Sequence, residues 1–415
     1  MRIAHVGVEI VPSQNGAFVG GLVKNVATVA AWQVAQGHDV SLFTSDVRGH
    51  VADGLQTPLG SVRRIPTRGE YGSFPFAATF AVRAARELRR AHRAAPFDVV
   101  HVHSAYATLG AVSNLLRGVD APRVFSLYSP NFRTTPGHDC TTGSRLVRNR
   151  VARASLAGYD ATVVPSGNLR SRLLEIGIDG ESVVQVPPAL APSMLDGLPS
   201  REEARRTLSI QDDPRVVLFL GNYSPWKGAD VLLRAFRRLR DAIPDAVLLA
   251  AWGEPYEWSG NRRSDLLALI ERLGLVDSVR HVGILGDVRL ALRAADVLAS
   301  PFRCTCKVLD YPLSILEAFA CERPVVSTRV GGIPELFDGD ARGTVVPPAD
   351  AEALARALTT LLADPAAATE AGLRGSRWVR ERFLDGTVGR TLEALYGNLD
   401  GARPGPRPNP VPAPN

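Results

Sequence analysis

Residues 304–328 contain the side chains that most clearly suggest a ligand-binding or catalytic site: Asp310, Pro312 and Glu317. Asp310 can accept hydrogen bonds from free amides and Pro312 has a φ angle that suits a first helical turn, so a helix is predicted to begin near Pro312. The first-turn amides of that helix lack partners and lie at the positive end of its dipole, which favours a bound phosphate. Glu317 projects one turn further in. The stretch therefore predicts a site for a phosphorylated ligand.

The residues around this helix resemble the signature of a known family. Residues 312–328 read PLSILEAFACERPVVST, and residues 331–336 read GGIPEL. This long motif resembles the donor-site signature of retaining family-4-type glycosyltransferases of the GT-B fold. The resemblance implies that Glu317 binds the ribose of a nucleotide-sugar donor, and it assigns further donor contacts to Ser314 and Leu316.

The resemblance extends to two other loops. Gly20 and Gly21 match a pair of glycines whose backbone amides approach the donor phosphates. Lys227, in the loop GNYSPWKG at residues 221–228, matches a lysine that stabilises the leaving diphosphate as a point charge. The family has an arginine five residues earlier, where this chain has Asn222, so the bidentate contact of an arginine is absent. Asn222 and Lys227 are both assigned to the donor.

Two further positions depart from the family pattern. The first glutamate of a spaced pair would fall at Leu309, and the adjacent Asp310 either substitutes for it or caps the helix. Tyr128 stands where the family usually has a histidine near the reacting sugar. We predict Lys227, Glu317, Asp310 and Tyr128 as the catalytic residues.

Two strand ends supply residues on the acceptor side. Residues 98–103 and 123–128 read as strands of an open α/β sheet, in which ligands gather at the carboxyl ends of the strands. His101 and His103 share one face because they alternate along a strand. With no carboxylate or cysteine nearby at ligand spacing, acceptor contact or packing is favoured over a metal pair, and no metal is expected. Tyr128 completes this acceptor side.

Alternating strand and helix patterns predict an α/β protein with two Rossmann-like doubly wound domains that face a cleft. Four segments are expected: an acceptor-side domain at 1–190, a nucleotide-sugar-binding domain at 191–385, a closing helix at 386–401 and a disordered Pro-rich tail at 402–415.

Within these domains, residues 159–164 are predicted to be the last strand before an interdomain linker at 184–192. Glu335 is predicted to begin another helix after the Gly-Gly turn. Residues 74–95 form an amphipathic helix rich in arginine, for which a solvated face is preferred over peripheral membrane contact.

Composition narrows the class of protein. The chain has 415 residues, 45% of them hydrophobic, which suffices for two buried cores. Forty-eight basic residues against 42 acidic ones leave a net charge of +6, a small excess for this length, and no nucleic-acid partner is expected. The dinucleotide fingerprint GxGxxG and the nucleotide loop GxxxxGK[ST] do not occur, which argues against a dinucleotide oxidoreductase.

The four cysteines do not form a CxxC pair, so neither a zinc site nor a disulfide framework is expected; they are Cys140, Cys304, Cys306 and Cys321. The chain shows neither a secretory leader nor an apolar run long enough to cross a bilayer. We expect a reduced, cytosolic, soluble protein.

The resemblance implies transfer of a sugar from a nucleoside diphosphate to an acceptor hydroxyl with retention. Natural-product, glycolipid and polysaccharide acceptors all remain open. No cofactor is expected, because cationic side chains and helix amides stabilise the leaving diphosphate. Two alternatives remain: a partner protein that binds nucleotide sugar with little or no turnover, and a sugar-nucleotide epimerase.

Overall fold

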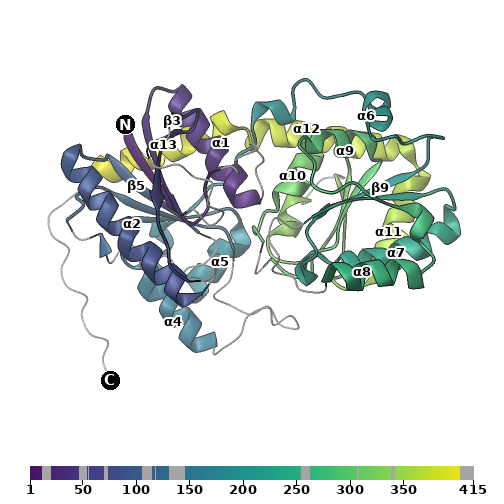
Figure 1. The fold of residues 1–415 in the computed structure, drawn as a ribbon, viewed down its shortest axis with the longest axis horizontal. Coiled ribbons are helices and arrows are strands. Elements are labelled where there is room, and N and C mark those ends of the chain that lie inside the picture. The colour runs from purple at the N-terminus through teal and green to yellow at the C-terminus, as the bar shows by residue number, and fades with distance from the viewer. Residues whose placement is uncertain are drawn as a thin grey trace.

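Two β-sheets, each flanked by helices, form two lobes that lie side by side (Figure 1). The computed structural model describes residues 1–11, 20–45, 54, 56–69, 73–104, 115–116, 118–129, 145–253, 262–305, 308–337 and 342–401. The tail predicted at 402–415 lies outside the described residues. The predicted fold class, two doubly wound α/β units, is confirmed.

The first sheet has eight strands in the order β3-β4-β2-β1-β5-β6-β7-β8. Neighbouring strands pair in parallel except β3 and β4, which are antiparallel. The central strands are covered on both faces, so every residue after the first in each of them is buried, polar ones included. The strands are β1 (Arg2–Gly7), β2 (Asp39–Ser45), β3 (Gln56–Thr57), β4 (Gly60–Ile65), β5 (Val99–Ser104), β6 (Arg123–Leu127), β7 (Ala161–Val164) and β8 (Val183–Gln185).

Helices cover both faces of this first sheet. One apolar cluster joins helices to the sheet through Phe80, Leu156 and Leu173, and clusters on the other face do so through Val29 and Leu392. The helices of the first cluster are α2 (Phe74–Ala94), α4 (Arg145–Leu156) and α5 (Gly167–Glu175); those of the second are α1 (Gly21–Ala35) and the C-terminal α13 (Asp385–Gly401).

The second sheet has six parallel strands in the order β11-β10-β9-β12-β13-β14. Its central strands are short apolar runs, such as VLAS in β12. The strands are β9 (Val216–Gly221), β10 (Val247–Trp252), β11 (Val279–His281), β12 (Val297–Ser300), β13 (Val325–Thr328) and β14 (Gly343–Val346).

Two apolar clusters hold helices against the faces of the second sheet. One face carries α7 (Ala229–Ala242), α8 (Arg262–Arg272) and α11 (Ala351–Ala363). The other carries α6 (Arg201–Thr207), α9 (Val288–Ala294), α10 (Leu313–Ala320) and α12 (Pro365–Arg382). The short helix α10 is among the most buried, because Leu313 and every residue from 315 to 320 are buried.

The chain crosses between the lobes at Leu190 and again at Leu384, and the two crossings are paired. The Leu190 amide donates to the Phe383 carbonyl at 2.7 Å, and the Asp385 amide donates to the Leu190 carbonyl at 3.0 Å. Helix α13, yellow in Figure 1, then lies on the purple and blue first lobe. The last helix thus ties the second lobe back to the first.

Two predicted elements differ from the structure. The predicted linker at 184–192 begins inside β8, which pairs with β7 and extends the first sheet by one strand. A strand of three residues is too short to show periodicity, which explains the error. Glu335 lies in a single 3-10 turn (Ile333–Leu336) followed by β14, rather than at the start of a longer helix. Among the described helices, none has the length and apolarity of a membrane span.

Candidate active site

Helix α10 presents Glu317 toward the first lobe. The helix begins after Pro312 without a side-chain cap. The side chain of Glu317 is 6% exposed, and its Oε1 accepts a hydrogen bond from Lys24 Nζ at 2.7 Å. Lys24 belongs to the first turns of α1 in the other lobe. The predicted donor residue Glu317 therefore lies at the contact between the lobes, paired with Lys24, which no motif in the sequence marked.

Lys227 lies in the second lobe and interacts electrostatically with Glu317. It ends a 3-10 turn (Pro225–Lys227) at the carboxyl end of β9, with its Nζ 4.7 Å from the centre of the Phe302 ring. Burial lowers the pKa of Lys227 to about 8, and the negative charge of Glu317 partly opposes that shift. Two side chains ninety positions apart thus belong to one charged site.

The loop that carries Lys227 has a constrained backbone. Gly228 has a φ of 71°, and a Cβ atom there would lie 2.0 Å from the carbonyl oxygen of Pro301, so only glycine fits. Asn222 Oδ1 accepts hydrogen bonds from the Ser224 amide at 3.2 Å and the Ser224 hydroxyl at 2.6 Å. Asn222 therefore stabilises the turn and contributes no charge to the site.

Asp310 does not cap α10, so the predicted alternative that it caps this helix was wrong. Its carboxylate is fully buried and accepts hydrogen bonds from the hydroxyl groups of Ser166 at 2.5 Å and Thr305 at 2.6 Å. The Asn168 side-chain amide donates to the same carboxylate at 2.9 Å. Since Ser166 and Asn168 belong to the first lobe, Asp310 joins the two lobes just ahead of α10. The sequence could not show this, because the partners lie more than 140 positions away.

Glu335 makes a second contact between the lobes. Its carboxylate accepts hydrogen bonds from the backbone amides of Gly167 at 2.9 Å and Asn168 at 2.6 Å, at the N-terminus of α5. The Tyr311 hydroxyl donates to the same carboxylate at 2.6 Å. A negative charge at a helix N-terminus is stabilised by the free amides and the helix dipole. Glu335 therefore holds α5 against the loop that leads into α10.

The remaining predicted donor residues lie around this contact. Gly20 precedes α1 with a φ of 104°, and a Cβ atom on Gly21 would lie 3.2 Å from the Leu309 side chain of the other lobe. Ser314 is half-buried in the first turn of α10, whereas the side chain of Leu316 packs in the core of the second lobe. The structure thus brings the glycine pair next to α10 and turns Leu316 away into the core.

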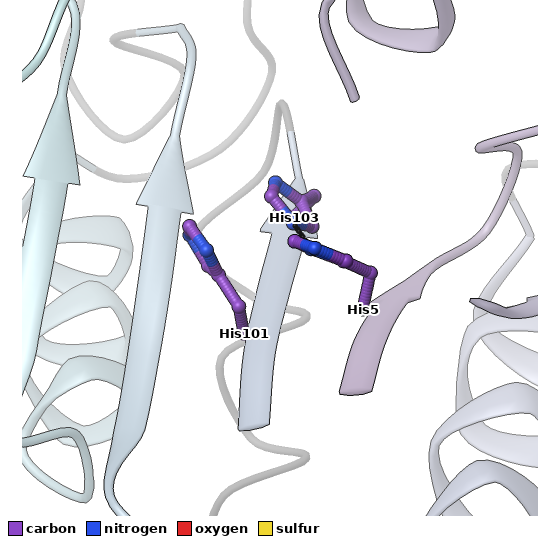
Figure 2. A group of neighbouring side chains, drawn as sticks. All are labelled: His5, His101 and His103. Carbon is purple, nitrogen blue, oxygen red and sulfur yellow. Dashed lines mark hydrogen bonds between the residues drawn. The ribbon is translucent and has the colours of Figure 1, made fainter. Parts of the chain in front are cut away.

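The predicted acceptor residues His101 and His103 belong to a buried cluster of three histidines. His5 on β1 lies beside them on β5, as Figure 2 shows, and its Nδ1 is 2.8 Å from His103 Nε2. His101 contacts the Tyr396 hydroxyl of α13 at 2.6 Å and the Ser126 hydroxyl at 2.7 Å. His5 could not be identified from the sequence, because the pairing of β1 with β5 cannot be inferred from either strand alone.

A chain of hydrogen bonds runs from this cluster to Tyr128. The Ala189 amide donates to Asn25 Oδ1 at 2.7 Å, so the Asn25 amide donates to the Tyr128 hydroxyl at 2.9 Å. That hydroxyl then donates to His103 Nδ1 at 2.9 Å.

The chain continues through the histidines. His103 Nε2 donates to His5 Nδ1, and His5 Nε2 donates to Gln33 Oε1 at 2.7 Å. From Asn25 to Gln33 Oε1, each of these bonds has one donor and one acceptor while both histidines are neutral, whereas the buried Gln33 Nε2 has no hydrogen-bond partner among the described residues.

Burial sets the charge state of this network. It lowers the pKa of His5 to about 4 and holds the pKa values of His101 and His103 well below the ordinary value of 6.5. It also raises the pKa of Tyr128 to about 12. The three histidines are therefore uncharged at neutral pH.

The same three histidines have the geometry of a potential metal site, because one nitrogen from each lies within 4.8 Å of the others. However, both ring nitrogens of each histidine already have a hydrogen-bond partner. A cation here would displace several of these bonds. The arrangement therefore fits a packed polar network better than a metal centre.

One cysteine contradicts the expectation that disulfides are absent. Cys304, in the loop that leads to α10, is disulfide-bonded, and its partner is not among the described residues. Cys321 is free and buried, while Cys140 and Cys306 lie outside the described residues. Cysteine spacing could not predict this bond, because it depends on the approach of two chain segments in the folded protein.

Comparisons with known proteins agree with this architecture. A family model described as "Glycosyl transferases group 1" matches residues 200–378, and one described as "Glycosyl transferase 4-like domain" matches residues 20–189. A D-inositol 3-phosphate glycosyltransferase of Kineococcus radiotolerans is 30% identical, with 94% of each chain covered. A GDP-mannose-dependent alpha-(1-6)-phosphatidylinositol monomannoside mannosyltransferase of Mycolicibacterium smegmatis is 32% identical, over 72% of this chain and 76% of the relative.

Solved structures show the same fold at lower identity. A sucrose-phosphate synthase from Thermosynechococcus elongatus superposes with a TM-score of 0.84 at 23% identity, covering 97% of this chain and 100% of that one. The Anabaena protein HepE, in complex with UDP and glucose, superposes with a TM-score of 0.74 at 18% identity, covering 96% of this chain and 99% of that one. These likenesses establish the two-lobed GT-B fold.

Proposed function

This chain belongs to the glycosyltransferases of the family-4 type with the GT-B fold, and we propose that it moves a sugar from a nucleoside diphosphate to an acceptor hydroxyl with retention. One observation carries this proposal: Lys227 and Glu317, from two separate motifs, interact in one partly buried site where the lobes meet. An ammonium and a carboxylate in such a site suit the two ends of a nucleoside diphosphate, the phosphates and the ribose.

Lys227 is the proposed stabiliser of the leaving diphosphate. Lys227 is half-buried, so the effective dielectric around its ammonium is lower than in water and its attraction to a phosphate is stronger. The first turn of α10, which includes half-buried Ser314, has no side-chain cap among the described residues, and its amides add positive potential on the same lobe. Glu317 accepts hydrogen bonds from the ribose hydroxyls, and the leaving phosphate oxygen takes the acceptor proton on the same face of the sugar.

Asp310 and Tyr128 are proposed to position this site. The Tyr128 carbonyl accepts a hydrogen bond from the Asp310 amide at 2.8 Å, which ties the end of β6 to the loop ahead of α10. The hydroxyl of Tyr128 is already engaged by Asn25 and His103. Both residues therefore fix the distance between the acceptor lobe and α10, and Gly20 and Gly21 complete the phosphate side.

The donor and acceptor are proposed from the relatives. One relative is named for D-inositol 3-phosphate and another for GDP-mannose and phosphatidylinositol monomannoside. We therefore propose a phosphorylated polyol or its lipid-linked form as the acceptor class. A screen of UDP- and GDP-linked sugars against inositol phosphates and phosphoinositide-containing vesicles tests this choice.

Replacing Lys227 by alanine tests the function itself. Lys227→Ala is expected to lower turnover by about 100-fold or more, because a buried charge that stabilises the leaving group is lost. Release of nucleoside diphosphate from the best donor of the screen measures this rate. Arg237→Ala, which removes an exposed cation from α7, serves as the control and should leave turnover unchanged. Equal rates for Lys227→Ala and the wild type would show that the loop is misassigned.

A further inference from the structure

We propose that Lys24 is the second cation of the donor site, supplied by the first lobe to the diphosphate held by the second. This inference rests on the proposed function, since it concerns the same donor. It assigns to Lys24 the charge that Asn222 cannot provide.

The position of Lys24 fits this role. It lies in the first turns of α1, and its amide donates to the Gly20 carbonyl at 3.2 Å. Its side chain reaches across the contact between the lobes, so that Nζ lies 2.7 Å from Glu317 Oε1. The Lys24 side chain is 32% exposed, whereas that of Glu317 is only 6% exposed. The carboxylate is thus held in place by its lobe, while the lysine remains free to exchange partners.

The charge of the ligand requires a second cation. A nucleoside diphosphate carries at least two negative charges, and Lys227 supplies one positive charge whose pKa is already lowered by burial. Arg303, near the same loop, is paired with Asp230 at 2.5 Å. Lys24, by contrast, is paired with Glu317, the carboxylate that is proposed to bind the ribose of the donor. Donor binding would release Lys24 from Glu317 at the moment when the phosphates offer it a new partner.

The composition of the chain supports a dedicated role for this lysine. Of 48 basic residues only three are lysines, Lys24, Lys227 and Lys307, and the other 45 are arginines. Lys24 follows the Gly20–Gly21 pair, Lys227 lies in the phosphate loop, and Lys307, which lies outside the described residues, precedes α10. A chain that otherwise uses arginine has lysine at each of the three segments assigned to the donor. A compact ammonium on a flexible stem suits a cation that must change partners.

Two chemical roles for the Lys24–Glu317 pair predict opposite results. If Lys24 binds the diphosphate, removing its charge weakens ligand binding. If the pair is instead a lock that keeps the ligand out, removing the charge frees Glu317 and strengthens binding. Calorimetric titration with UDP and GDP, and with uridine and guanosine, separates these outcomes.

Lys24→Gln is expected to bind the better nucleoside diphosphate about 10- to 100-fold more weakly, the range of one lost charge-assisted contact, with no loss of nucleoside affinity because Glu317 is freed for the ribose. Lys24→Arg should recover part of that loss, and Arg237→Gln should bind like the wild type. Thermal unfolding of each variant shows whether the fold is retained. Unchanged or tighter binding by Lys24→Gln overturns the inference and leaves the proposed function intact, whereas wild-type protein that binds neither UDP nor GDP contradicts both.

Discussion

At the scale of single residues, burial decides which side chains are available for chemistry. His101 and His103 were predicted to contact an acceptor or to pack, and Tyr128 was assigned to the acceptor side. All three are buried and bonded to one another or to neighbouring elements, which agrees with packing for the histidines. Lys24 and Lys227, from opposite lobes, both interact instead with Glu317. The proposed donor site therefore consists of two cations and one carboxylate, while the histidines pack inside the first lobe.

Because the buried histidines are neutral, the free energy of unfolding should depend on pH. The pKa of His5 is about 4 in the folded protein and about 6.5 when unfolded, so the unfolded chain binds an extra proton between these values. The contribution of His5 to the free energy of unfolding is therefore fully present above pH 6.5. It is lost as the pH falls toward 4, which lowers the free energy of unfolding by about 3 kcal/mol for His5 alone.

Denaturant unfolding at several pH values between 5 and 7.5 measures this effect. His5→Gln removes one titrating group. Between pH 6 and pH 5 its free energy of unfolding should therefore fall by about 1.2 kcal/mol less than that of the wild type. Identical slopes for the variant and the wild type would mean that His5 is already charged or solvated in the folded state.

At the scale of elements, close packing of α1 against α13 fastens the C-terminus to the first lobe. Gly389 of α13 faces Trp32 of α1, and a Cβ atom there would lie 2.2 Å from the indole ring. Gly397, further along the same helix, has open space around its Cα. The sequence predicts both residues to be helical, and only their neighbours tell them apart.

These two glycines form a matched pair for mutagenesis. Gly389→Ala is expected to cost about 1 to 3 kcal/mol of folding free energy, because overpacking forces the helices apart. Gly397→Ala should be neutral or stabilising by up to about 1 kcal/mol, since alanine is the better helix former. Urea unfolding of both variants measures the difference. Equal stability of the two would show that Gly389 does not pack tightly against Trp32.

At the scale of the whole molecule, polar contacts hold the lobes together at Asp310, just before α10, and at Glu335, in the 3-10 turn after β13. Asp310 receives donors from Ser166 and Asn168, and Glu335 receives the first amides of α5. Charge-assisted hydrogen bonds of this kind contribute about 1.5 to 3 kcal/mol each when both partners are fixed. Such contacts can be broken and remade, so we expect the lobes to reach a more open arrangement when these contacts are lost.

Glu335→Gln is expected to favour the open arrangement by about 1 to 3 kcal/mol, because the charge at the N-terminus of α5 is lost. Small-angle X-ray scattering should then report a larger radius of gyration than for the wild type. Glu352→Gln, which changes an exposed carboxylate at the start of α11, is the control and should leave the radius unchanged. A compact Glu335→Gln variant would assign the closure to the other contacts between the lobes.

Local signals in the sequence determined the two α/β units, the position of α10 and the candidate role of Glu317, because strand runs, helix starts and a long motif act over a few neighbouring residues. Tertiary structure alone decided that Lys24 meets Glu317, that His5 joins His103, and that Asp310 bonds to Ser166. These pairs lie 98 to 293 positions apart. Which such pairs meet depends on how strands align and how two lobes close, and no local period in the chain records either.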